Sequence, residues 1–234
     1  MTTGLREPKN ASESGKVVEE RKLKTQQPKN RSLALAEILL RTGASVPSGA
    51  KRLKIDGIAC DSRKVAAGYL FFALLGAHLD GNRYVRDAIE RGAIAIASEG
   101  APPVDLPANV VWIHVAESRK GLAVAAANFF GRPAEALQLI AVTGTNGKTT
   151  TSSLIDSALR ASGAETGLFG TIAYHTPLGE YLAPNTTPES LDLQGFFAEI
   201  RDAGGKYVVL EASSHALVMD RLWAAAFSQP FLPI

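Results

Sequence analysis

Apolar and polar positions along this chain follow two periods, one typical of buried strands and one typical of amphipathic helices. Short apolar runs that predict strands stand at 57–60, 69–76, 93–98 and 109–116. Runs of helical period stand at 82–92, which Gly92 ends, and at 118–131. Because strands alternate with helices, the pattern predicts an α/β layered domain.

The same alternation resumes after a break at 132–137, "RPAEAL", which Pro133 marks as a linker. The elements predicted beyond it are a strand at 137–144, a helix after Lys148, a strand at 166–174, a loop rich in Pro and Thr, a helix at 189–203 and a last clear strand at 206–214. The fold class expected is therefore α/β, with a small N-terminal unit at 32–133 and a mainly parallel-sheet, phosphate-loop unit at 134–234.

The chain before the first unit has no sustained apolar period. Ordered structure is expected to begin near Ser32, where Leu33, Leu35, Ile38 and Leu39 have the spacing of one helix face. Residues 1–31 hold eight Lys/Arg against four Asp/Glu and no aromatic residue. They are predicted to form a disordered basic leader, with contact to nucleic acid or to a membrane surface as the alternative.

Composition is that of an ordinary globular protein, with 46% hydrophobic and 21% charged residues. No apolar stretch reaches the roughly 18 residues that span a bilayer, and the polar N-terminus does not resemble a secretory signal. Cys60 is the only cysteine, which excludes an internal disulfide and suits the cytoplasm. Outside the leader the chain is slightly acidic, so no nucleic-acid or membrane partner is expected.

The stretch 139–163, "LIAVTGTNGKTTTSSLIDSALRASG", predicts a strand, a glycine turn and a helix. A helix start offers unpaired backbone N–H groups and the positive end of the helix dipole, which suit a phosphate. Gly144 and Gly147 let the backbone wrap closely, Lys148 can reach terminal phosphates and the Thr149 hydroxyl can help to hold Mg²⁺. The common phosphate-loop pattern has a glycine where this chain has Val142, so a plain turn with a chance lysine is the alternative.

Glu211 ends the apolar run "YVVLE" and so lies at the edge of the sheet where ligands of α/β proteins bind. One strand from a phosphate loop, this carboxylate is a candidate Mg²⁺ ligand, and a solvated strand-end acid is the alternative. His215 fits a ligand, a base or a packed structural histidine, and it is given no catalytic role.

Two further polar stretches fit either a binding role or a purely local structural role. "PNTTPES" at 184–190 offers an amide and two hydroxyls, although Thr187 could simply cap a helix starting near Pro188. "CDSR" at 60–63 could be a strand-end turn, and Cys60 lacks the neighbours of a nucleophile or zinc ligand.

Three separate stretches resemble the Mur ligases of bacterial cell-wall synthesis. They are "DSRKVAAGYLFFALLGAHLDG" at 61–81, "TGTNGKTTT" at 143–151, and "NTTPES" with "EASSHAL" at 185–190 and 211–217. Within the family the match is best to ligases that add the third residue to UDP-N-acetylmuramoyl-L-alanyl-D-glutamate. The phosphate loop alone also fits a folylpolyglutamate synthase, and the first stretch also resembles the ligase that adds the terminal dipeptide. The resemblance covers roughly 32–221.

The resemblance implies a domain for the uridine nucleotide followed by a domain for ATP and Mg²⁺. It also implies an acyl phosphate, made from the substrate carboxylate, that an amino acid (meso-diaminopimelate or lysine) attacks. The positions that match the family's ATP-binding residues are Gly144, Thr145, Asn146, Gly147, Lys148, Thr149 and Thr150. The positions that match the family's residues for binding the UDP-MurNAc-dipeptide are Cys60, Ser62, Ala77, His78, Leu79, Asn185, Thr186, Thr187, Ser213 and Arg221. Lys148 and Glu211 are the catalytic matches, and Thr149 and Glu211 the metal ligands.

Two departures from the family pattern qualify this expectation. Met219 stands where many relatives have a substrate-contacting glutamine, and residues 222–234, "LWAAAFSQPFLPI", carry no charge and do not resemble the family. The chain is therefore predicted to be a C-terminally truncated fragment that cannot complete ligation. A monomer is expected, although the sequence leaves the oligomeric state open. A non-catalytic nucleotide-binding remnant is the alternative, and a folylpolyglutamate-type ligase is disfavoured because that group lacks the first domain.

Overall fold

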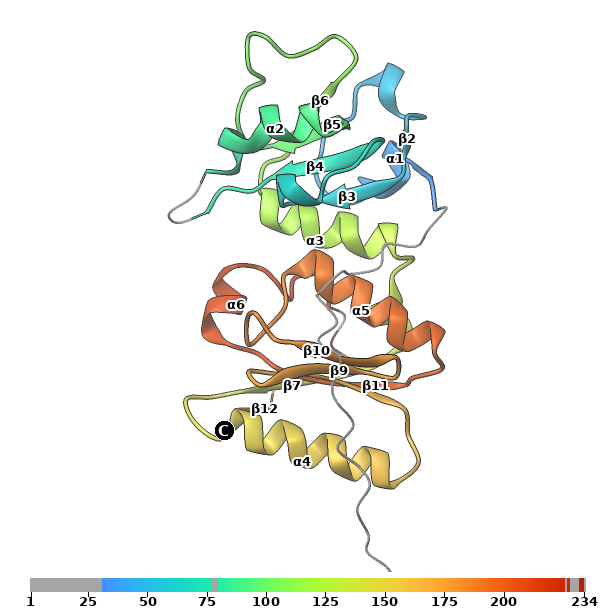
Figure 1. Ribbon diagram of the computed structural model, residues 1–234, viewed down its shortest axis with the longest axis vertical. Coiled ribbons are helices and arrows are strands. Elements are labelled where there is room, and N and C mark those ends of the chain that lie inside the picture. The colour runs from blue at the N-terminus through green and yellow to red at the C-terminus, as the bar shows by residue number, and fades with distance from the viewer. Residues whose placement is uncertain (1–30, 77–79, 226, 228–231, 234) are drawn as a thin grey trace, which may run out of the picture.

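The computed structural model describes residues 31–76, 80–225, 227 and 232–233. Its two larger sheets are stacked one above the other with helices on both faces of each, and a two-stranded sheet accompanies them (Figure 1). The leader prediction and the substrate positions Ala77, His78 and Leu79 lie outside the described residues. No described helix is long and apolar enough to cross a membrane.

The first sheet has four parallel strands in the order β3-β4-β5-β6. These are Gly57–Ala59, Tyr69–Ala73, Ala93–Ser98 and Val111–His114. Alternate side chains point to opposite faces, so Phe72 packs with α3 (Ser118–Phe129) while Phe71 packs with α2 (Val85–Glu90). Both faces are buried, which explains the nearly continuous apolar runs in the sequence.

The second sheet has the order β10-β9-β8-β11-β7-β12, in which β8, β11, β7 and β12 pair in parallel and β9 runs antiparallel to both of its neighbours, β8 and β10. The strands are β7 Gln138–Thr143, β8 Thr166–Phe169, β9 Ala173–Thr176, β10 Gly179–Leu182, β11 Tyr207–Glu211 and β12 Leu232–Pro233. Helix α4 (Lys148–Ala161) covers one face and α5 (Ser190–Asp202) the other, with the short α6 (Ser214–Val218) after β11.

Helices α3 and α5 lie against each other between the two sheets (Figure 1). Leu191 and Ala198 of α5 are buried in the same apolar cluster as Leu122 and Phe129 of α3. The two units therefore share a packed boundary, and the segment predicted to be a linker turns through a short 3₁₀ helix, Pro133–Ala136.

Four details differ from the elements predicted by sequence. The expected helix near Ser32 is short: Leu33–Ala34 form β1, which pairs with β2 (Lys54–Ile55), and α1 is only Leu35–Ile38. The run at 166–174 is two antiparallel strands, because the chain turns at Gly170 between β8 and β9. The Pro- and Thr-rich loop contains β10, and β11 is not the last strand.

Candidate functional site

The strand β11 places Glu211 beside the glycine loop. In the parallel pairing Glu211 lies opposite Val142 of β7, two residues before Gly144, and Leu210 lies opposite Phe169 of β8. The segments that leave β7, β8 and β11 at their carboxyl ends therefore share one edge of the sheet, which is where α/β sheets bind ligands.

The glycine loop 144–147 and the start of α4 hold three backbone N–H groups without a partner among the described residues. Gly144 has φ 146° and Gly147, which precedes α4, has φ 77°, a left-handed conformation that a residue with a Cβ rarely adopts. Among the described residues no hydrogen bond uses the N–H of Asn146, Gly147 or Lys148. Thr145, Asn146 and Gly147 are exposed, so these donors face solvent at the positive end of a 14-residue helix.

Lys148 begins α4 and holds its ammonium group over the loop. Its Nζ donates to the Gly144 carbonyl at 2.8 Å. An ammonium has three N–H donors, so this bond occupies one of them. Thr149 and Thr150 follow in the first turn, half-buried and exposed respectively, and bring hydroxyls to the same end of the helix.

Glu211 is almost fully buried, with 1% of its surface exposed, which rules out the solvated strand-end acid. Its carboxylate accepts hydrogen bonds from the Thr171 N–H at 3.2 Å and the Thr171 hydroxyl at 3.1 Å. Gly170 makes room for it, since a Cβ there would lie 2.3 Å from Glu211 Oε1. A larger residue at 170 would force the carboxylate to move.

No ion pair in the described part of the chain includes Glu211. Buried carboxylates are normally paired with a cation or bound to a metal. The described residues contain no group of three His, Cys, Asp or Glu side chains that would form a protein-only metal cage. One carboxylate and a hydroxyl next to a phosphate loop match Mg²⁺ instead, because this ion commonly takes few protein ligands together with phosphate and water oxygens.

The "NTTP" segment runs from β10 towards α5 and packs against Glu211. Thr187 is fully buried: its hydroxyl donates to the Glu211 carbonyl at 2.7 Å and accepts from the Ser213 N–H at 3.3 Å. The interpretation of Thr187 as a helix cap is wrong, because Glu189 is the N-cap of α5. Thr187 thus affects the site by fixing the main chain at Glu211 and Ser213.

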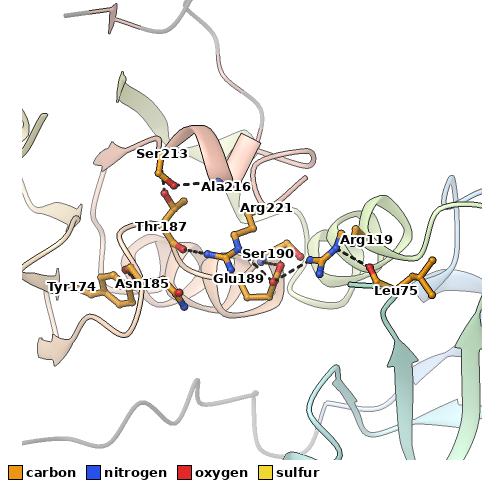
Figure 2. A network of polar contacts seen from close by, with 10 residues as sticks. All are labelled: Leu75, Arg119, Tyr174, Asn185, Thr187, Glu189, Ser190, Ser213, Ala216 and Arg221. Atoms are coloured by element: carbon orange, nitrogen blue, oxygen red, sulfur yellow. Dashed lines mark hydrogen bonds and ion pairs between the residues drawn. The ribbon is translucent and has the colours of Figure 1, made fainter. Parts of the chain in front are cut away.

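The other residues matched to the peptide end lie around Thr187. Asn185 is exposed, with its carbonyl accepting from the Tyr174 hydroxyl, and the Thr186 hydroxyl lies 3.2 Å from that of Thr171, to which it can donate. Ser213 caps α6 by accepting from the Ala216 N–H at 3.2 Å. Arg221 donates to the Thr187 carbonyl at 2.9 Å, as Figure 2 shows.

The described residues matched to the nucleotide end follow β3. Ser62 is buried, and its hydroxyl together with Arg91 holds the pKa of Asp87 below its usual value. Burial, followed by the negative charges of Glu189 and Asp192, raises the pKa of the Cys60 thiol. Because both carboxylates belong to the second unit, Cys60 lies close to the boundary between the units.

Cys60 gives a direct chemical test of this environment. A raised pKa lowers the thiolate fraction at pH 8, and the thiolate is the reactive form, so a disulfide reagent should label the folded chain slowly. We expect the rate to rise at least about tenfold in urea, where the thiol regains its ordinary pKa. The absorbance of the released thiol measures both rates, and equal rates in the two conditions would contradict the raised pKa.

Sequence reasoning missed three polar residues that complete these contacts. Thr171 holds the Glu211 carboxylate, while Arg119 and Glu189 link the two units. Nothing in the local pattern marks them, since Arg119 stands in an ordinary helix and Thr171 in a turn. Their roles arise from contacts between segments that are 40 or more residues apart.

A strand, an exposed glycine loop, a helix carrying lysine and a buried carboxylate on the adjacent parallel strand define a phosphate-loop α/β protein. Two family models match the chain in line with this class. "Mur ligase family, catalytic domain" matches 54–130, and "Mur ligase middle domain" matches 142–229. This chain belongs to the Mur ligase family.

Its relatives carry one recurrent name. It is 50% identical over 174 residues to the UDP-N-acetylmuramoyl-L-alanyl-D-glutamate–2,6-diaminopimelate ligase of Solibacter usitatus (strain Ellin6076), covering 74% of this chain and 35% of that protein. It is 46% identical over 170 residues to the ligase of the same name from Geobacillus kaustophilus (strain HTA426), covering 72% and 34%. A solved structure of a ligase with this name has a TM-score of 0.65 at 27% identity, covering 84% of this chain and 39% of that one.

The comparisons correct one expectation and show how much of its relatives the chain covers. The middle-domain match reaches residue 229, and β12 pairs with β7, so the expectation that the likeness ends at Arg221 is wrong. The chain spans about a third of the length of these curated relatives.

Proposed function

We propose that this protein is the part of an ATP-dependent amide-bond ligase that binds ATP and UDP-N-acetylmuramoyl-L-alanyl-D-glutamate. The reaction of the ligase activates the substrate carboxylate as an acyl phosphate, which an amino acid then attacks. The names of the relatives favour 2,6-diaminopimelate as that amino acid. Residues 32–133 bind the uridine nucleotide and 134–234 bind ATP, in a cytoplasmic monomer.

The observation that carries this proposal is the buried carboxylate of Glu211, which forms no ion pair among the described residues and lies beside the exposed glycine loop. The loop N–H groups and Lys148 attract the phosphates, and Glu211 with the Thr149 hydroxyl would hold Mg²⁺. When bound, Mg²⁺ would neutralise charge on the phosphates during phosphoryl transfer.

The chain's own residues contribute position and charge rather than covalent chemistry. Transfer of a phosphoryl group to a carboxylate brings anions together, so the reaction needs fixed positive potential more than it needs a nucleophile. Lys148 and the N-terminus of α4 supply that potential from one side. The Thr187 hydroxyl fixes the main chain of Glu211 and Thr171 fixes its side chain, so the carboxylate is held before any ligand arrives.

Glu211→Gln tests the metal assignment. In the wild-type chain we expect MgCl₂ to raise the affinity for ATP, because Glu211 would hold the metal next to the phosphates. The neutral amide is a weaker ligand, so the variant should lose most of this increase, about tenfold in affinity, while its affinity for metal-free ATP stays the same or rises. Calorimetric titration with ATP, with and without MgCl₂, measures both.

Glu180→Gln is the matched control, since it removes an exposed carboxylate from β10 of the same unit. It should bind Mg²⁺–ATP as the wild type does. A Glu211→Gln chain with an unchanged magnesium effect would remove the metal role, and a wild-type chain that binds no ATP would overturn the proposed function.

A further inference from the structure

Two arginines meet one carboxylate at the boundary between the two units (Figure 2). Arg119 lies in the first turn of α3 in the first unit, Glu189 caps α5, and Arg221 follows α6. Glu189 Oε2 lies 3.6 Å from Arg119 Nη1 and 3.5 Å from Arg221 Nε. The carboxylate is thus shared by guanidinium groups from different units.

These three side chains are largely shielded from water. Their exposed fractions are 19% for Arg119, 21% for Glu189 and 12% for Arg221. Arg119 Nη1 and Arg221 Nε are buried and have no hydrogen-bond partner among the described residues, so each relies on its ion pair with Glu189. Salt and solvent screen a pair of this kind less than they screen a surface ion pair.

Arg119 is also tied to the segment that leads to the nucleotide end. Its Nε donates to the Leu75 carbonyl at 3.3 Å, and the Leu75 N–H donates to the hydroxyl of the adjacent Ser118 at 3.4 Å. Leu75 follows β4 and comes just before residues 77–79, which the family resemblance matches to the uridine nucleotide. Arg119 thus connects the boundary between the units to the segment that precedes that end.

Arg221 connects the boundary to the phosphate end of the site. It donates to the Thr187 carbonyl at 2.9 Å, and the Thr187 hydroxyl donates to the Glu211 carbonyl at 2.7 Å. A continuous series of polar contacts thus runs from Leu75 across the boundary to the main chain of Glu211. Figure 2 shows this series from Leu75 to Thr187.

We propose that Arg119, Glu189 and Arg221 form an interdomain clasp that sets the distance between the two ends of a substrate spanning both units. The three are positioning residues, and the inference rests on the proposed function. A ligand that contacts both units gains affinity when their spacing is already correct, because it spends no binding energy on arranging them. A ligand that contacts only the first unit gains nothing from the clasp.

The test compares two probes on the full chain. UDP-N-acetylmuramoyl-L-alanyl-D-glutamate reaches both units, whereas UDP reaches only the nucleotide end. In Arg119→Gln and Glu189→Gln we expect the affinity for the long probe to fall about tenfold and that for UDP to stay within about twofold. In Glu189→Gln the side-chain amide oxygen can still accept from the Ser190 N–H, so the start of α5 keeps its cap.

A double variant and a control separate the clasp from local damage. If the two residues act as a unit, Arg119→Gln with Glu189→Gln should weaken the long probe no more than either single change. Arg86→Gln removes an exposed ion pair with Asp105 within the first unit, and it should alter neither affinity. Thermal melting of every variant confirms that each chain is folded.

Each outcome bears on the inference. A selective loss for the long probe that is not additive supports the clasp. Equal losses for both probes, additive losses or no loss would overturn it while the proposed function stands. A wild-type chain that binds neither probe would overturn the proposed function and the clasp with it.

Discussion

Lys148→Ala is expected to lower the affinity of the chain for ATP about a hundredfold. The ammonium group is the only side-chain cation in the loop and first turn of α4, and bonds to charged groups contribute about 1.5–3 kcal/mol each. Among the described residues its head donates only to the Gly144 carbonyl, so its removal should leave the fold intact. The loss should be much smaller for AMP, because the lysine is placed to reach the terminal phosphates.

Calorimetric titrations with ATP and AMP measure this difference. Lys206→Ala is the control: it removes an exposed lysine next to the opposite end of β11 and should change neither affinity. Affinity for UDP should also be unchanged, because that ligand is assigned to the first unit. Equal losses for ATP and AMP would show that Lys148 does not contact terminal phosphates.

The sequence alone predicts the part of this site that local pattern encodes. A strand, two glycines and a lysine at the start of a helix sit within ten residues of one another, so 139–151 can be interpreted without any partner. The strand that ends at Glu211 is also clear in the sequence, because the uncharged, largely apolar run 207–210 leads up to it without a break.

What the sequence leaves open are the contacts between distant segments. The burial of Glu211 depends on Gly170 and Thr171, which follow β8, and on the "NTTP" segment packed over it. The sharing of Glu189 by two arginines likewise needs the packing of α3 against α5, which no period in the chain reports. Hydrophobic patterning gives each helix a buried face but does not say which helix will cover it.

Short and irregular elements escape prediction for a different reason. β10 has four residues in a loop rich in Pro and Thr, and β12 has two residues with Pro233 at its end. Both lie at the edges of the sheet, where a few backbone hydrogen bonds suffice. Segments of this length carry too few positions for a period of two to be recognised.

Phe196→Ala is expected to reduce the free energy of unfolding by about 4 kcal/mol. The ring is 2% exposed and lies 5.3 Å from Phe169, 5.7 Å from Tyr174 and 5.3 Å from Tyr181, measured between ring centroids. Its removal leaves a cavity between α5 and the strands β8, β9 and β10, and truncations of buried aromatic residues typically cost about 3–5 kcal/mol.

Denaturation in urea followed by circular dichroism measures the loss, with Leu182→Ala as the control. Leu182 ends β10 of the same sheet with 61% of its surface exposed, so its truncation should change stability by less than about 0.5 kcal/mol. Because Phe196 anchors the helix that Glu189 caps, the same variant should also loosen the clasp and weaken binding of the spanning substrate. A loss below about 1 kcal/mol would mean that α5 is not held by this aromatic cluster, and Glu189 would then lack the rigid support that its position requires.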